Sequence, residues 1–119
     1  MKKLLKLYVI LLLIGGCFPK ENRDISDLIK SSRLEDKMRA YYLIGETKDT
    51  NYISFLIEDL GNPKISNHLN FKGMSVYQCK INALRKFSNF DPPNEVTYKP
   101  DSVNIDFYVN WVLENNLLK

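Results

Sequence analysis

The chain has 119 residues, a length that supports one small domain rather than two. It carries 17 Lys and Arg side chains against 14 Asp and Glu, which gives a formal net charge of +3. Three of the basic residues, Lys2, Lys3 and Lys6, precede an apolar run at the N-terminus. Beyond that run the basic and acidic side chains are equal in number, which excludes a globally basic nucleic-acid-binding protein.

The first 16 residues have the pattern of a secretion signal. A basic stretch, Met1–Lys6, is followed by the apolar run Leu7–Ile14 and by two glycines. A helix that spans a bilayer needs roughly 20 apolar residues, so this run is too short to cross a membrane unaided. We therefore predict that residues 1–16 are a signal peptide.

The four residues Ile14, Gly15, Gly16 and Cys17 resemble the lipobox of bacterial lipoproteins. The resemblance implies cleavage between Gly16 and Cys17, with a diacylglyceryl group on the Cys17 thiol. Residues 17–22 would then be the lipidated cysteine and a short tether. The protein would be held on a membrane of the cell envelope by acyl chains such as palmitate, of which two or more give a stable anchor. The alternative is an ordinary signal peptide with a chance cysteine.

The residue after the cysteine bears on which membrane is used. Position 18 is Phe, whereas the inner-membrane retention signal of such lipoproteins is Asp. In a cell with two membranes, the resemblance therefore favours the outer membrane, facing the periplasm.

Only one other cysteine, Cys79, occurs in the chain. If Cys17 is acylated, no intramolecular disulfide can form, and the stability of the domain must come from packing. Cys79 lies in a helical pattern and suits a small buried apolar residue. A catalytic thiolate would need a histidine beside it, and the single histidine, His68, lies in a polar loop.

Apolar residues recur at helical spacing in five segments after residue 23. The first begins after Asp24, the second extends from Leu34 to Gly45, and the third from Ile53 to Leu60. Asp49 or Thr50 would cap the third helix, and Gly61 would end it by supplying a left-handed turn.

The last two helices follow a long loop. Ser75 is the expected N-cap of a helix that ends near Phe87, and the final helix starts near Asp101–Asn104. We find no convincing strand alternation bounded by a hairpin turn. The sequence therefore predicts an all-α domain over residues 23–119.

The stretch Lys37–Leu60 resembles HEAT repeats of the bacterial, phycobilisome-lyase-like kind. A second, less faithful unit would include Val76, Ala83 and Leu84. The resemblance implies a short α-α superhelix of about two repeats, covered at its end by a C-terminal capping helix that contains Trp111, and it supports a scaffold role. The matching positions in the first unit are Lys37, Ala40, Ile44, Gly45, Asp49, Ile53, Leu56, Ile57 and Leu60.

Two of these positions have physical roles in the repeat. A small residue at Ala40 would allow paired helices to approach, and Gly45 would end the first helix of the unit tightly.

The sequence contains no motif of a known catalytic, metal or cofactor site. It has no HExxH, no CxxC pair, no calcium-binding loop and no glycine-rich phosphate loop. We therefore expect a protein that is not an enzyme and that holds no metal or cofactor. The less favoured alternative is an envelope enzyme, which would need His68 in a pocket beside a carboxylate or Cys79.

The residues most suited to contact a partner lie in and near the loop 62–73. Long loops in compact domains are often functional, and exposed aromatic residues are favoured interface anchors. The candidates are His68, Phe71, Lys72 and Tyr77. The leading hypothesis is a lipid-anchored module that binds another envelope protein. A narrower alternative is an immunity or inhibitor lipoprotein that blocks a toxin or hydrolase in the envelope.

Overall fold

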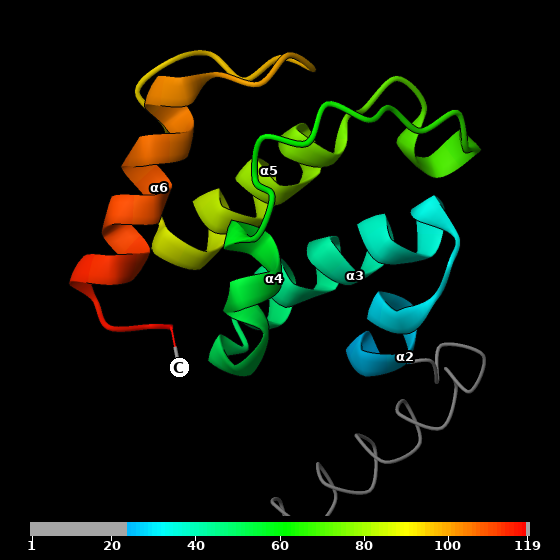
Figure 1. The fold of residues 1–119 in the computed structure, drawn as a ribbon, viewed down its shortest axis with the longest axis horizontal. Helices are drawn as coiled ribbons and strands as arrows, with labels where there is room; N and C mark the ends of the chain where they lie inside the picture. Colours follow the sequence, from blue (N-terminus) through cyan, green and yellow to red (C-terminus); the bar gives the residue numbers. More distant parts are fainter. Residues whose placement is uncertain (1–23, 119) are drawn as a thin grey trace, which may run out of the picture.

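A computed structural model describes residues 24–118 of the chain. The predicted signal peptide, the cleavage site between Gly16 and Cys17, and the lipid attachment at Cys17 lie outside the described residues. The described part is helical, and its only strand-like feature is one isolated antiparallel bridge between Ile65 and Ser75. The prediction of an all-α fold is confirmed. The helices are α2 (Ile25–Lys30), α3 (Leu34–Thr47), α4 (Ile53–Ile57), α5 (Val76–Ser88) and α6 (Ser102–Glu114), with short 3-10 turns at Thr50–Tyr52 and Leu69–Phe71 (Figure 1).

Side-chain caps fix the predicted starts of three helices. Asp24 accepts a hydrogen bond from the backbone N–H of Asp27 at the start of α2, and Asp101 accepts one from Val103 at the start of α6. Ser75 and Gln78 form a reciprocal capping box at the start of α5. Because each cap satisfies backbone donors that the first turn leaves unpaired, these boundaries could be read from the sequence.

Helices α3 and α5 form the centre of the fold and run in the same direction (Figure 1). Residue numbers increase in the same direction along both helices: Met38 contacts Cys79, and Glu46, two turns later on α3, contacts Lys86, two turns later on α5. The closest approach is at Gly45, where an added Cβ would lie 2.8 Å from the Cα of Ala83. Gly45 is thus a contact point between two helices.

The prediction that Gly45 ends its helix is wrong. Helix α3 continues to Thr47, and the left-handed residue after it is Lys48, with a φ of 54°. Glycine was needed at position 45 because the neighbouring backbone is close there. Glycine suits both the end of a helix and a close contact between two helices, and the helical pattern of the sequence does not distinguish these two roles.

Helix α4 is shorter than its apolar spacing predicted. Asp49 caps a 3-10 turn that continues into α4, but the helix stops at Ile57 instead of Leu60. The left-handed residue after the helix is Asp59, with a φ of 51°, so the prediction that Gly61 supplies this turn is also wrong. Leu60 is nevertheless buried, because the chain turns back onto the core.

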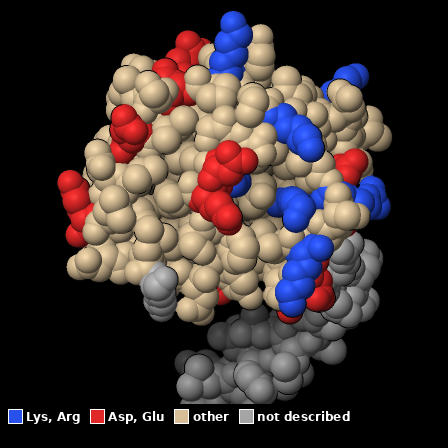
Figure 2. All heavy atoms as spheres, viewed as in Figure 1, with Lys and Arg blue, Asp and Glu red and all other residues tan. Residues whose placement is uncertain are grey.

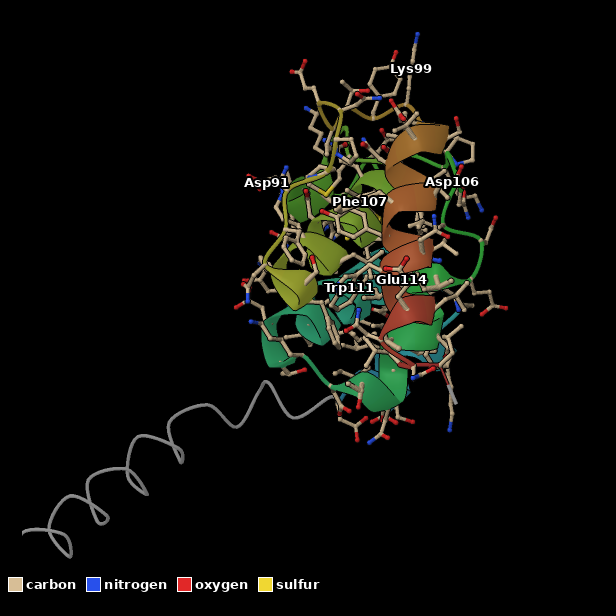
Figure 3. All side chains as sticks on the ribbon, turned by 90° about the vertical axis from the view of Figure 1, so that its left-hand side faces the viewer. Asp91, Lys99, Asp106, Phe107, Trp111 and Glu114 are labelled. Carbon is tan, nitrogen blue, oxygen red and sulfur yellow. The ribbon has the colours of Figure 1, made fainter. Side chains whose placement is uncertain are left out.

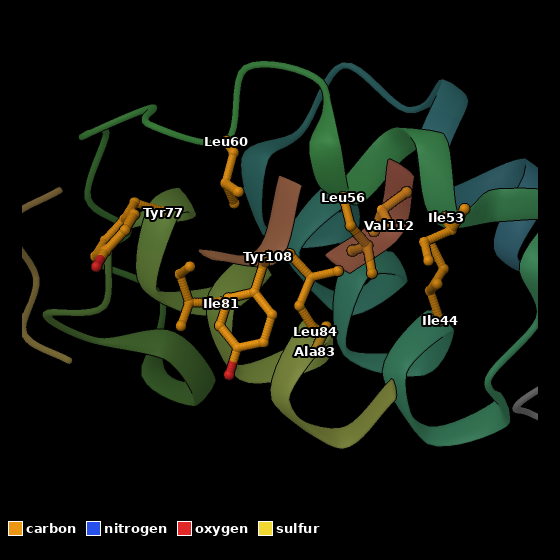
Figure 4. Close-up of a cluster of buried hydrophobic side chains, with 10 residues drawn as sticks. All are labelled: Ile44, Ile53, Leu56, Leu60, Tyr77, Ile81, Ala83, Leu84, Tyr108 and Val112. Carbon is orange, nitrogen blue, oxygen red and sulfur yellow. The ribbon is translucent and has the colours of Figure 1, made fainter. Parts of the chain in front are cut away.

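The main hydrophobic core lies between α3, α4, α5 and α6 (Figure 4). Helix α6 contributes Tyr108 and Val112, both fully buried, and Trp111 packs edge-on against Phe87 of α5 at 6.4 Å between ring centroids. The expectation that the last helix covers one end of the helical stack is therefore consistent with its packing. The buried set drawn in Figure 4 is Ile44, Ile53, Leu56, Leu60, Tyr77, Ile81, Ala83, Leu84, Tyr108 and Val112.

Candidate functional site

A pocket of about 660 Å³ lies between α3, α5 and the segment before α5. Pockets of this size are typical of ligand and peptide sites. Successive turns of two helices line it, since residues 39 and 42 are one turn apart on α3, and residues 79, 82 and 86 follow one another on α5. The lining residues are Arg39, Tyr42, Asn70, Phe71, Met74, Cys79, Asn82, Ala83, Arg85 and Lys86.

The apolar part of the pocket rests on a second, smaller core cluster. Phe71 and Met74 pack against the buried side chains of Met38 and Cys79. The Cys79 thiol donates a hydrogen bond to the carbonyl oxygen of Met38 at 3.4 Å. Burial raises the pKa of Cys79 to about 12, so the group is a thiol at neutral pH and forms part of an apolar wall. The prediction of a small buried residue at this position is confirmed.

The polar rim of the pocket is cationic. Lys86 forms an ion pair with Glu46 and lies 4.3 Å from the ring centroid of Tyr42, over the ring face. The Nε of Arg85 is buried, makes no hydrogen bond within residues 24–118, and lies 3.5 Å from a carboxylate oxygen of Asp91. These two cations already have carboxylate neighbours outside the pocket lining.

Three more polar side chains of the lining are unpaired among the residues that the structure describes. Within the described range 24–118, the side chains of Arg39 and Asn82 make no hydrogen bond or ion pair, and neither does the hydroxyl of Tyr42. All three line the same pocket beside Met74. Free donors and a free cation over an apolar floor are the features by which a pocket recognises an amphipathic ligand.

The predicted partner-contact residues in the loop have different positions. Phe71 is half-buried and lines the pocket. His68 is also half-buried, but its Nδ1 accepts a hydrogen bond from the backbone N–H of Asn70 at 3.3 Å, which caps the 3-10 turn. Lys72 is exposed at the end of that turn. His68 and Lys72 are not among the lining residues.

Tyr77 is a core residue, and its selection as a partner contact was wrong. Its side chain is fully buried, and its hydroxyl accepts a hydrogen bond from the side-chain amide of Asn104 at 3.1 Å. Tyr77 lies on α5, a helix that is buried on more than one side, with Val76, Ile81 and Leu84 also buried. The neighbouring Leu69, which sequence reasoning passed over, is 88% exposed at the tip of the loop.

A buried lysine was also missed. Lys80 is only 3% exposed, and its ammonium donates a hydrogen bond to the carbonyl oxygen of Glu58, just after α4. It lies 4.8 Å from the ring centroid of Tyr41, and desolvation lowers its pKa. Its contacts satisfy a helix end, so its role is structural. The sequence held a signal for this, because Lys80 lies between two apolar residues, Cys79 and Ile81, both of which are buried.

Charge is distributed unevenly over the face of the molecule drawn in Figure 2. Figure 2 shows acidic side chains gathered on the side where α6 lies, and basic side chains mainly on the opposite side. On α6, Phe107 and Trp111 turn toward α5, whereas Asp106 projects away from it (Figure 3).

Two further properties hold for the part of the chain that the structure describes. None of its helices has the length and hydropathy that crossing a bilayer requires. Between residues 24 and 118, no group of three or more His, Cys, Asp or Glu side chains is placed to bind a metal ion. The sequence matches no protein-family model, and neither the curated proteins nor the solved structures contain a match to it.

Proposed function

We propose that this protein is a lipid-anchored component of the cell envelope that binds another protein through the surface of α3 and α5. The observation that carries the proposal is the pocket between these helices, with an apolar floor and unpaired polar groups beside it. The lipobox-like sequence ending at Cys17 supports the anchor. An acylated N-terminus and a domain starting near residue 24 would place the pocket close to a membrane surface.

The arrangement of the helices supports a repeat-type scaffold. Parallel neighbours such as α3 and α5 are what two successive helix-turn-helix units produce, because equivalent helices of adjacent units pack in the same direction. Leu69 adds to this surface: an 88% exposed leucine, next in sequence to the pocket residues Asn70 and Phe71, is suited to contact a partner.

The anchor is tested by replacing the acylated thiol. Cys17→Ser removes the nucleophile that receives the diacylglyceryl group and changes one atom of the side chain. In cells fed labelled palmitate, we expect label in the wild-type protein and none in the variant. Cys79→Ser is the matched control, because it removes the other thiol and should retain the label. Equal labelling of the wild type and Cys17→Ser would refute the anchor.

The binding surface is tested by photocrosslinking in intact cells. A photoreactive phenylalanine at position 42 lies in the pocket, and the same group at position 98 is the matched control. Tyr42 and Tyr98 are 48% and 49% exposed, and each ring lies beneath a lysine. We expect a discrete crosslinked protein from position 42 only, and its identity distinguishes a scaffold from an inhibitor of a toxin or hydrolase. The absence of a product specific to position 42 would refute the proposed function.

A further inference from the structure

We propose that the α3–α5 pocket binds a short extended segment of the partner in which one carboxylate residue and one apolar residue are two positions apart, so that both side chains lie on the same face of the segment. This inference rests on the proposed function and specifies the chemistry of the partner. Its basis is the juxtaposition of Arg39 and Asn82 with Phe71 and Met74 in one pocket.

The dimensions of the pocket suit an extended peptide. Its lining on α5 extends from Cys79 to Lys86, which at about 1.5 Å per residue is about 10 Å of helix. An extended chain advances about 3.3 Å per residue, so about three peptide residues match this length. Because successive side chains of an extended chain point to opposite faces, two residues that are two positions apart place their side chains in the pocket together, while the backbone reaches the amide of Asn82.

The floor of the pocket selects an apolar side chain. Phe71, Met74 and Ala83 supply contact surface, and the Cys79 thiol beside them is uncharged. Methionine is flexible and polarisable, and it makes favourable contacts with aromatic rings. A phenylalanine of the partner is therefore the strongest occupant of this floor.

The charges select a single carboxylate. Lys86 and Arg85 have Glu46 and Asp91 beside them, whereas Arg39 has no ion pair in the part of the chain described. One unpaired guanidinium neutralises one carboxylate, in a geometry that allows two parallel hydrogen bonds. A phosphate dianion would carry a second charge that no unpaired cation of the lining neutralises, and Glu46 and Asp91 lie close by, so a phosphorylated headgroup is disfavoured.

The test uses the three methionine methyl groups of the full-length chain in neutral detergent micelles. Met74 lines the pocket, Met38 is buried beneath it, and Met1 lies far from both in sequence. The probe is the capped peptide Gly-Ser-Glu-Ser-Phe-Gly, followed in a carbon-13 methyl spectrum. We expect a saturable ring-current shift of the Met74 methyl group, with a Kd of about 1 mM or tighter.

Matched peptides and variants distinguish specific recognition of the peptide from non-specific charge attraction between the peptide and the protein. Peptides with Gln in place of Glu, or Ala in place of Phe, should each bind about threefold to tenfold more weakly. Arg39→Gln should weaken the original peptide by a similar factor. Arg33→Gln is the control, because it removes the same charge from an arginine outside the pocket that pairs with Glu35.

The outcomes are distinct. No shift at Met74, equal weakening by Arg33→Gln and Arg39→Gln, or stronger binding of short-chain phosphatidylglycerol would each overturn the assignment. A crosslink from position 42 to α6 of a second copy would do the same, since it would make this chain its own partner. If position 42 crosslinks a different protein while the peptide fails, the proposed function stands and only this inference falls. If position 42 crosslinks nothing, the proposed function itself fails.

Discussion

The contact between Gly45 and Ala83 gives the sharpest test of the fold. In Gly45→Ala, the new methyl group would lie 2.8 Å from the Cα, 3.0 Å from the Cβ and 3.0 Å from the carbonyl oxygen of Ala83. Two of these three atoms belong to the backbone of α5, so rotation of a side chain cannot relieve the contact. Helices α3 and α5 must separate along the centre of the fold.

The expected loss of stability follows from two opposing terms. Overpacking of a core costs about 1–3 kcal/mol, and the backbone contacts place this case at the upper end. Alanine is about 1 kcal/mol better than glycine inside a helix, which offsets part of the cost. We expect the free energy of unfolding to fall by about 2 kcal/mol, which for a domain of this size lowers the Tm by about 8–16 °C.

Denaturant unfolding of the full chain, followed by circular dichroism, measures this change. Gly61→Ala is the matched control, because its new methyl group would meet only the flexible end of Ile105, at 3.3 Å. We expect the control to change the free energy of unfolding by less than about 0.5 kcal/mol. If Gly45→Ala is as stable as the wild type, the reasoning on helix approach is refuted.

Three further predictions address the core, pH and the last helix. Asn104→Leu should lower the free energy of unfolding by about 2–4 kcal/mol in urea titrations. The substitution removes the amide that bonds to the Tyr77 hydroxyl and to the backbone N–H and carbonyl of Asn94, and it leaves these groups unpaired. Burial raises the pKa of Cys79 from 9.0 to about 12. Since the unfolded chain loses this proton first, the free energy of unfolding should fall as the pH rises from 9.0 toward 12, and less steeply in Cys79→Ala. A chain truncated after Pro100 loses α6 and should show no cooperative thermal transition.

Each of these predictions has a clear contrary result. A neutral Asn104→Leu variant would show that the buried amide network contributes nothing, whereas Tyr77→Phe should cost only about 1 kcal/mol. If the free energy of unfolding falls equally steeply with pH in the wild type and in Cys79→Ala, a group other than Cys79 causes the alkaline sensitivity. Tyr108 would be the next group to test, because burial also raises its pKa to about 12. A sharp thermal transition in the truncated chain would show that α2 to α5 fold without α6.

Local signals in the sequence determined the helices and most of their starts. Asp24, Ser75 and Asp101 each accept hydrogen bonds from the first turn of a helix, and that chemistry depends only on neighbouring residues. The end of α4 was missed because it depends on distant groups. The ammonium of Lys80 bonds to the carbonyl of Glu58, and no local pattern connects residues 22 positions apart.

The candidate site depends even more than the helix ends on residues that are distant in the sequence. Phe71, which was selected as an aromatic residue in a long loop, lines the pocket, but Arg39, Met74 and Asn82, which also line it, were not selected. They come from two helices and the connecting segment, and they meet only because α3 and α5 run in parallel. Tyr77 was misplaced for the related reason that an aromatic residue on a helix gives no indication of which other helix covers it.

The close contact at Gly45 and the open pocket beside it are parts of one arrangement. The absence of a side chain at Gly45 brings the ends of α3 and α5 together, and the longer side chains of Arg39 and Tyr42 lie on the same helix toward its start. The two helices pack along their length and are closest at Gly45, and the pocket lies beside this contact, where the segment with Phe71 and Met74 packs against Met38 and Cys79. The geometry therefore ties the proposed binding to helix packing: a substitution that forces α3 and α5 apart at Gly45 should weaken peptide binding at Met74 as well as lower stability.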